Sequence, residues 1–318
     1  MRKITLLSLI LFSFLLAFPQ KPKISGDLVI FHAGSLAVPM KKMIEAFNKE
    51  YPNVNVKAEA AGSVASARKI TDLNRECDIL ASADYQVIDK MLIPKYADWN
   101  IRFASNEMAI VYTLQSKYAD KITRNNWYDI LLKKDVLVGR ADPNSDPCGY
   151  RTVLTCKLAE KYYKKTGLAG KLLAKNNNMM RPKEVDLLAL LETQSVDYIF
   201  IYKSIAIQHG LKYLALPDNI NLKNPAFNKF YSTVNVKING DKPGEKVIQN
   251  GEAMIYGLTI LKNAPNRAAA EAFVKFMLDK NKGMKIMQQC GQPSVIPLQS
   301  TGYEKLPAEL KKFATGNQ

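Results

Sequence analysis

The chain has 318 residues, of which 47% are hydrophobic and 23% are charged, so it is long enough for two globular domains. This composition excludes a disordered, collagen-like or low-complexity chain. The net charge of +16 comes from lysines dispersed through helix-like segments. Together with the export signal described next, this dispersal argues against a protein that binds nucleic acid.

Residues 1–20 have the pattern of a secretory signal peptide. Arg2 and Lys3 precede an apolar run of roughly 15 residues, from Ile4 to Phe18, and a membrane span needs about 20. A good A-x-A cleavage site is missing, so an uncleaved N-terminal anchor stays the alternative. In either case, we expect the mature protein to work outside the cytoplasmic membrane.

Strands and helices alternate in the first part of the chain. Residues 27–32 predict a buried strand, and apolar residues then recur at helical spacing from Met40 to Tyr51. The next elements are a strand over 54–58, a helix from about residue 66 and a buried strand over 77–81. This order predicts a parallel sheet with right-handed crossovers.

A second series of elements begins near residue 106. Residues 108–112 predict a strand that leads out of the first unit, and a strand over 136–140 starts the second unit. The elements that follow are helices near 147–165 and 182–192, a strand over 198–202, a returning strand over 254–261 and a helix that presents Phe273 and Met277.

These elements predict an α/β fold of two lobes joined by two crossing strands. Lobe 1 comprises residues 27–113 and 254–318, and lobe 2 comprises residues 114–253. Each lobe has a mostly parallel sheet flanked by helices. Because open sheets of this kind bind ligands beyond the carboxyl ends of their strands, we expect a ligand cleft between the lobes.

Small and hydroxyl-bearing residues follow two strands of the first lobe. Gly34 and Ser35 precede a helix whose early Pro39 suits a first turn, and Gly62-Ser63 repeats the arrangement after the next strand. Unpaired N–H groups at a helix start favour an anion. Taken singly, either serine could simply cap its helix.

Carboxylates take the corresponding places in the second lobe. Asp146-Pro147 is typical of an N-cap and first helical residue, just before Cys148, and Glu184 falls in the first turn of a helix opened by Pro182. Capping or the helix dipole alone explains each carboxylate taken singly. Two carboxylates repel an oxyanion, unless its central atom is a high-valent metal that accepts oxygen ligands.

Two alternatives to these carboxylates stay open. Asp142 competes with Asp146, although only Asp146 directly precedes the predicted helix start. Glu192 competes with Glu184, although it lies roughly two turns into the helix, away from the positive end.

The cysteines and histidines predict no metal site of their own. The spacing of the four cysteines fits no zinc pattern or disulfide scaffold, so we expect small, unpaired core residues. The chain has two histidines, and a site built from imidazoles is therefore not expected. The cysteines are Cys77, Cys148, Cys156 and Cys290.

The chain resembles a known family over nearly its whole length after residue 20. The likeness is carried, in this order, by HAGSL (32–36), AGSVASARKI (61–70), ADPNSDPCGYR (141–151), RPKEVDLLALLE (181–192) and DYIFIYKSIAIQHGL (197–211). Together these segments resemble the archaeal-type tungstate/molybdate-binding proteins of ABC importers.

This resemblance implies a type II two-lobed, periplasmic-binding-protein-like fold that closes on one tungstate or molybdate ion. It implies a monomer without a resident cofactor that delivers the ion to a membrane permease. Asp146 and Glu184 would be carboxylate ligands of the Mo or W centre. The remaining implied ligand contacts are Gly34, Ser35, Ser63, Pro147, the Cys148 amide and the Tyr202 hydroxyl.

Other functions agree less well with these residues. Ser35 has His32 three residues away, but a G-x-S-x-G elbow is absent and the two side chains would point to opposite faces of a strand, which argues against a hydrolase. Tyr162-Tyr163 could serve a ferric-ion binder, but these tyrosines lie in a lysine-rich helix far from the sheet ends. Binders of sulfate, phosphate or organic anions and a sensory ectodomain complete the alternatives.

Overall fold

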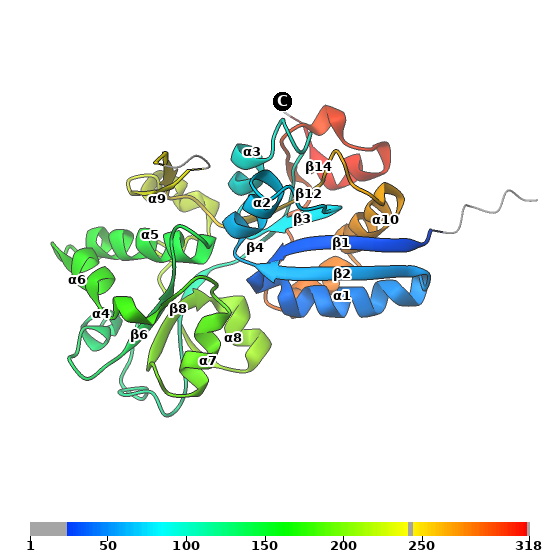
Figure 1. Ribbon diagram of the computed structural model, residues 1–318. Coiled ribbons are helices and arrows are strands. Elements are labelled where there is room, and N and C mark those ends of the chain that lie inside the picture. The colour runs from blue at the N-terminus through cyan, green and yellow to red at the C-terminus, as the bar shows by residue number, and fades with distance from the viewer. Residues whose placement is uncertain (1–23, 241–243, 317–318) are drawn as a thin grey trace, which may run out of the picture.

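The computed structural model describes residues 24–240 and 244–316, so the predicted signal peptide or anchor at 1–20 lies outside the described residues. Within these two ranges, no helix is long and apolar enough to cross a membrane. The chain forms two lobes, each built around one five-stranded sheet (Figure 1).

The sheet of lobe 1 is flanked by helices from both ends of the chain. Its strands, in order across the sheet, are β2 (Val54–Ala61), β1 (Gly26–Ala33), β3 (Ile79–Ser82), β12 (Ile255–Ile260) and β4 (Ile101–Ser105). Its helices are α1 (Ala37–Glu50), α2 (Ser63–Thr71), α3 (Tyr85–Met91), α10 (Arg267–Leu278) and α11 (Gly283–Gln289). Phe47 of α1 packs against Phe273 of α10 with ring centroids 5.0 Å apart, which joins the two ends of the chain in one core.

Lobe 2 has the same general plan. Its strands, in order, are β7 (Met180–Arg181), β6 (Val138–Ala141), β8 (Tyr198–Tyr202), β5 (Met108–Tyr112) and β9 (Lys212–Ala215). Its helices are α4 (Trp127–Leu131), α5 (Pro147–Tyr162), α6 (Leu168–Ala174), α7 (Asp186–Glu192), α8 (Lys203–His209) and α9 (Asn228–Tyr231). Trp127 of α4 packs on Phe200 in the central strand β8, with ring centroids 6.0 Å apart.

Each sheet contains one strand that runs opposite to its neighbours. β12 is antiparallel to β3 and β4 in lobe 1, and β5 is antiparallel to β8 and β9 in lobe 2. Residues 108–112, predicted as part of lobe 1, therefore belong to the second sheet, and the chain first changes lobes at Asn106 and Glu107. A continuous apolar strand is buried equally well in either sheet, which is why its pattern alone did not assign it.

Two helices begin at other residues than predicted. The helix expected from about residue 66 already begins at Ser63. The helix expected to open at Pro182 begins at Asp186, so Glu184 lies in the turn before α7 and not inside its first turn. The amide of Glu184 donates to a carboxylate oxygen of Asp146, a long-range partner that holds this turn in place.

A two-stranded hairpin contacts both lobes. It consists of β10 (Asn235–Asn239) and β11 (Lys246–Asn250), which pair antiparallel. Arg68 of α2 donates to the carbonyl of Gly240, while Lys157 of α5 donates to the carbonyl of Asn235. The hairpin is therefore a third link between the lobes. A short pair of strands, β13 (Leu298–Gln299) and β14 (Ala314–Thr315), lies near the C-terminus.

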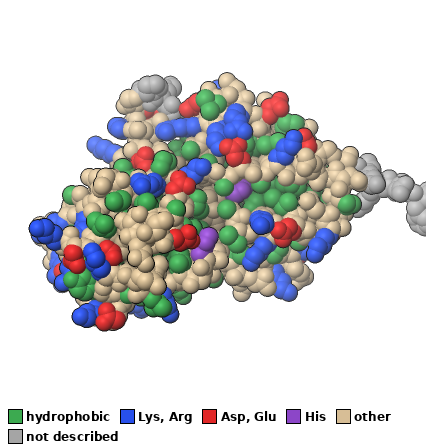
Figure 2. Space-filling model, turned by 60° about the horizontal axis from the view of Figure 1, so that its bottom comes forward, with side chains coloured by type: hydrophobic (Ala, Val, Ile, Leu, Met, Phe, Trp, Pro, Cys, Tyr) green, Lys and Arg blue, Asp and Glu red, His purple; other side chains and the backbone are tan. Residues whose placement is uncertain are grey.

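The charged side chains are mixed on the visible surface. On the face shown in Figure 2, Lys and Arg side chains are scattered among Asp and Glu side chains instead of gathering in one patch. This face therefore lacks the concentrated basic stripe that is typical of proteins that bind nucleic acid.

Candidate ligand-binding site between the lobes

The four predicted segments meet between the lobes. A Cβ atom built on Gly34 of lobe 1 would lie 3.0 Å from both carboxylate oxygens of Glu184 in lobe 2. One built on Gly62 would lie 2.3 Å from the carbonyl oxygen of Ser145. Gly62 is needed because only a residue without a Cβ allows its backbone to approach the Ser145 backbone so closely, whereas at Gly34 the fit against the Glu184 side chain is tight.

Ser35 lies in a single 3-10 turn, Gly34–Leu36, between β1 and α1, and is fully buried. Its Oγ is 2.9 Å from the hydroxyl oxygen of Tyr256 on β12. The same phenol oxygen accepts hydrogen bonds from Nδ2 of Asn106 at 2.8 Å and from Nε2 of Gln292 at 3.3 Å. Ser35 is therefore held by a buried polar cluster and not by the backbone of its own helix.

The other two predicted hydroxyls are also buried and bonded. Ser63 is the first residue of α2, and its Oγ accepts a hydrogen bond from the amide of Ala83 at 2.9 Å. Tyr202 ends β8, and its hydroxyl oxygen accepts one from Nη1 of Arg151 at 3.1 Å. In both residues the oxygen is an acceptor, so the hydroxyl proton is left for another partner.

Asp146 holds two segments of lobe 2 together. It is the N-cap of α5, whose first residue is Pro147, and its Oδ1 accepts from the amide of Cys148 at 2.8 Å. Its Oδ2 accepts from the amide of Glu184 at 3.0 Å. The Cys148 amide, predicted as a ligand donor, therefore already donates to Asp146 in this structure.

Glu184 differs from every other group in the site. Its side chain is 1% exposed, and neither carboxylate oxygen makes a hydrogen bond of ordinary geometry with the described residues, although the Ser35 backbone and the Asp146 side chain lie close enough to act on its pKa. Burial raises the pKa of Glu184 well above its ordinary value, and the nearby Asp146 carboxylate raises it further. A buried carboxylate without a partner is costly, so this site calls for a proton or for an electropositive centre.

The two residues that competed for these roles have their carboxylates elsewhere. Asp142 uses its carboxylate inside its own loop, where it accepts from the amide of Asn144 and from the hydroxyl of Ser145. Glu192 is an exposed residue at the end of α7. The structure thus brings the carboxylate of Asp146 and the Glu184 segment together, whereas Asp142 meets Asp146 only through its backbone carbonyl, which accepts from the Asp146 amide at 3.0 Å.

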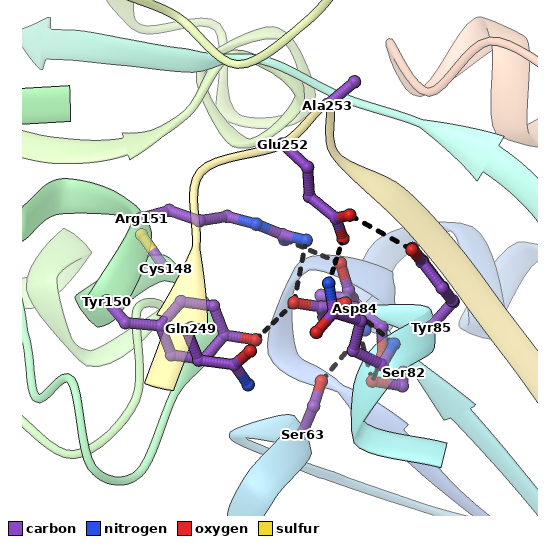
Figure 3. Close-up of polar contacts among 12 residues, drawn as sticks. Ser63, Ser82, Asp84, Tyr85, Cys148, Tyr150, Arg151, Gln249, Glu252 and Ala253 are labelled. Carbon is purple, nitrogen blue, oxygen red and sulfur yellow. Dashed lines mark hydrogen bonds and ion pairs between the residues drawn. The ribbon is translucent and has the colours of Figure 1, made fainter. Parts of the chain in front are cut away.

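Sequence reasoning missed an arginine in the site. Arg151 of α5 is 4% exposed, and its Nη1 donates to the carbonyl of Ala83 at 2.6 Å while its Nη2 lies 3.4 Å from Oδ2 of Asp84. Tyr150 donates to the same Asp84 oxygen at 2.5 Å (Figure 3). Both residues stand in the segment 141–151, but their partners are in the other lobe, and no spacing in the sequence indicates that contact.

A carboxylate from the segment after the hairpin extends this interlobe network. Glu252 accepts from the hydroxyl of Tyr85 at 3.1 Å (Figure 3). It also accepts from Nε2 of Gln86. Burial raises the pKa of Glu252, and the nearby Asp84 contributes to the rise. The start of α3 in lobe 1 therefore contacts both α5 and the hairpin segment.

The thiols and acidic groups do not build a separate metal centre in the described part of the chain. All four cysteines are buried and unpaired. Groups of three or more His, Cys, Asp and Glu side chains that could hold a metal ion are absent from the described residues.

Comparison with known proteins shows which family the chain resembles in sequence. The chain matches the bacterial extracellular solute-binding protein family over residues 28–291. It is 50% identical over 297 residues to an uncharacterized solute-binding protein of Petrotoga mobilis, covering 92% of this chain and 91% of that protein. It is 40% identical over 315 residues to the molybdate/tungstate-binding protein WtpA of Pyrococcus abyssi, covering 90% of this chain and 89% of that protein.

A solved structure shares the fold at low identity. The periplasmic molybdate-binding protein of Azotobacter vinelandii superimposes with a TM-score of 0.62 at 15% identity, over 85% of this chain and 99% of that chain. The predicted two-lobed fold of periplasmic binding proteins is thus confirmed. The chain belongs to the family of bacterial extracellular solute-binding proteins.

Proposed function

We propose that this protein captures tungstate or molybdate outside the cytoplasmic membrane and delivers it to the permease of an ABC importer. The observation that carries the proposal is the buried Glu184 carboxylate, which lies next to Asp146. Its two oxygens make no hydrogen bond of ordinary geometry with the described residues. A high-valent Mo or W centre is a hard acid and accepts carboxylate oxygens in addition to its oxo groups. The 40% identity to a molybdate/tungstate-binding protein supports this choice of ligand.

The residues of the site would divide the work between lobes. Ser35, Ser63 and Tyr202 would donate hydrogen bonds to oxo groups, with Gly34 allowing close approach. Asp146 can bind the metal centre while it still caps α5, because a carboxylate has about four lone-pair sites and two amides occupy only two of them. The positive end of the α5 dipole, at Pro147 and Cys148, would add to the attraction of the anion.

Hydrogen phosphate is the competing ligand that one observation favours. It carries a proton that it could donate to the unpartnered Glu184 carboxylate, whereas sulfate has no proton to give at neutral pH. A ferric-ion site at Tyr162 and Tyr163 has less support, because Tyr163 donates to the carbonyl of Arg124 and Tyr162 is 41% exposed.

The cellular setting follows from the N-terminal pattern. We propose that residues 1–20 direct export, either as a cleaved signal or as a retained anchor. We also propose that a monomer binds one ion and presents it to the permease, with the first and second lobes as the two closing halves.

Calorimetric titration of the purified protein with tungstate, molybdate, sulfate, phosphate and ferric iron tests this function. We expect tight binding of tungstate and molybdate and weak or no binding of the others. X-ray absorption at the tungsten edge should then show more than four oxygen ligands. It should show fewer in Glu184→Gln and an unchanged number in the control Glu192→Gln. Bound tungstate with four oxygen ligands, or failure of both metal oxyanions to bind, would overturn the proposal.

A further inference from the structure

We propose that Tyr256 is a positioning residue that fixes the hydroxyl of Ser35 as a hydrogen-bond donor toward the bound oxyanion. The inference rests on the proposed function and adds to it three residues that contact Ser35 or Tyr256 and not the ligand. They are Asn106, Tyr256 and Gln292.

Asn106 supplies the first proton to the Tyr256 oxygen. Its Oδ1 accepts from the amide of Glu107 at 2.9 Å, which fixes the orientation of the side-chain amide. Its Nδ2 therefore faces the hydroxyls of Ser204 and Tyr256, both at 2.8 Å. An amide NH₂ group has two protons and cannot accept, so one proton goes to each hydroxyl oxygen.

Gln292 supplies the second proton. Its Nε2 lies 2.9 Å from the carbonyl oxygen of Ser35, which can only accept, so this end of the amide is the nitrogen. The other proton of Nε2 faces the Tyr256 oxygen at 3.3 Å. The phenol oxygen thus accepts from two amides, and its single proton is directed to Oγ of Ser35 at 2.9 Å.

The consequence falls on the proton of Ser35. Because its oxygen accepts from Tyr256, and the described residues offer this side chain no other partner, its own proton is free to point into the site. The hydroxyl oxygens of Ser63 and Tyr202 are acceptors too, since the backbone amide and the guanidinium group that they contact can only donate. Their own protons are therefore also left for another partner. All three hydroxyls therefore present protons, which suits an oxyanion whose oxygens carry none.

The cluster also lies where the chain passes between lobes. Asn106 follows β4 of lobe 1 and precedes β5 of lobe 2, and its bond to Ser204 reaches α8 of lobe 2. Tyr256 is in β12, the strand by which the chain returns to lobe 1. The group that orients Ser35 is thus anchored to both lobes.

A double-mutant cycle on tungstate binding tests the role of Tyr256. The variants are Tyr256→Phe, Ser35→Ala and their combination. The control is Tyr198→Phe, which removes a buried, hydrogen-bonded hydroxyl in lobe 2, away from Ser35. Tyr256→Phe should weaken binding about 10-fold alone, in line with a hydrogen bond to a charged ligand. In the presence of Ser35→Ala it should change binding by no more than about twofold, because its effect passes through Ser35. Tyr198→Phe should leave the affinity unchanged.

Equal losses from Tyr256→Phe in both backgrounds would overturn the inference, since the phenol would then act independently of Ser35. Tyr256→Phe should still fold, because both amides that donate to the Tyr256 oxygen keep another acceptor. Asn106 still donates to Ser204, and Gln292 still donates to the Ser35 carbonyl. Neutron diffraction of the ligand-free protein gives a readout that needs no ligand. A deuteron on the Tyr256 oxygen directed at Ser35 supports the inference, and a deuteron on Ser35 directed at Tyr256 overturns it. This result stands even if tungstate fails to bind and the proposed function falls.

Discussion

Apart from the Tyr202 hydroxyl of lobe 2, the two lobes bring opposite kinds of groups to the candidate site. The edge of lobe 1 offers hydroxyls, Ser35 and Ser63, each already bonded to a fixed partner. The edge of lobe 2 offers two buried carboxylates, and only Asp146 is satisfied, by two amides. Lobe 1 is thus a prearranged donor surface, whereas Glu184 of lobe 2 is a buried group whose cost is relieved when a ligand binds.

The largest expected effect is on ligand affinity when Glu184 is removed. Glu184→Ala should weaken tungstate binding about 100-fold or more, equivalent to roughly 3 kcal/mol, because the metal centre loses a carboxylate ligand. At neutral pH it should also raise the free energy of unfolding of the ligand-free protein by about 1–2 kcal/mol, since an unpartnered buried group disappears. Calorimetry and urea denaturation measure the two effects. An affinity as high as that of the wild type would remove Glu184 from the site.

The contact between lobes gives the next largest effect. Gly62→Ala places a methyl group against the carbonyl oxygen of Ser145, which belongs to the backbone of the opposite lobe and cannot turn aside. We expect tungstate affinity to fall about 10-fold to 100-fold through hindered closure, with little change in the stability of the separated lobes. Gly170→Ala is the matched control, because a Cβ at Gly170 in α6 meets nothing within 4 Å. Equal affinities in the two variants would contradict a closed state of this geometry.

Asp146 sharpens the contrast between the two carboxylates. Asp146→Ala leaves the amides of Cys148 and Glu184 without an acceptor and removes the N-cap of α5. We expect the free energy of unfolding to fall by about 1–3 kcal/mol, the reverse of the change expected for Glu184→Ala. Urea denaturation of the ligand-free variants measures both signs. A stability change of the same sign in both variants would show that the two carboxylates are not held differently.

The last prediction concerns pH. Burial, followed by the Asp146 charge, raises the pKa of Glu184, so the folded protein keeps a proton that the unfolded chain loses above a pKa of about 4.3. The wild-type free energy of unfolding should therefore fall as pH rises above this value, by at most about 1.4 kcal/mol per unit from this one group. Glu184→Gln should lack this component. A difference between the two proteins that stays constant from pH 4 to 8 would contradict the raised pKa.

Much of the fold could be predicted because its signals are local. The strands at 108–112 and 198–202 have the predicted bounds, since continuous apolar runs define them. The start of α5 also matches, because Asp146-Pro147 combines an N-cap with a favoured first residue.

The remaining features depend on partners that are distant in the chain. The start of α7 is displaced because Asp146 holds the Glu184 amide, 38 residues away. Residues 108–112 belong to lobe 2 because they pair with β8 and β9. The roles of Arg151 and Tyr256 depend on Asp84 and Ser35, which only the folded chain brings to them.

The hairpin of β10 and β11 has a kinetic consequence. Arg68 and Lys90 bind it from lobe 1, and Lys157 and Lys161 bind it or the residues just before it from lobe 2. A rotation that separates the lobes while the hairpin stays on one of them breaks the bonds to the other. Substitutions of these four cations should consequently change the dissociation rate of a ligand that none of them contacts.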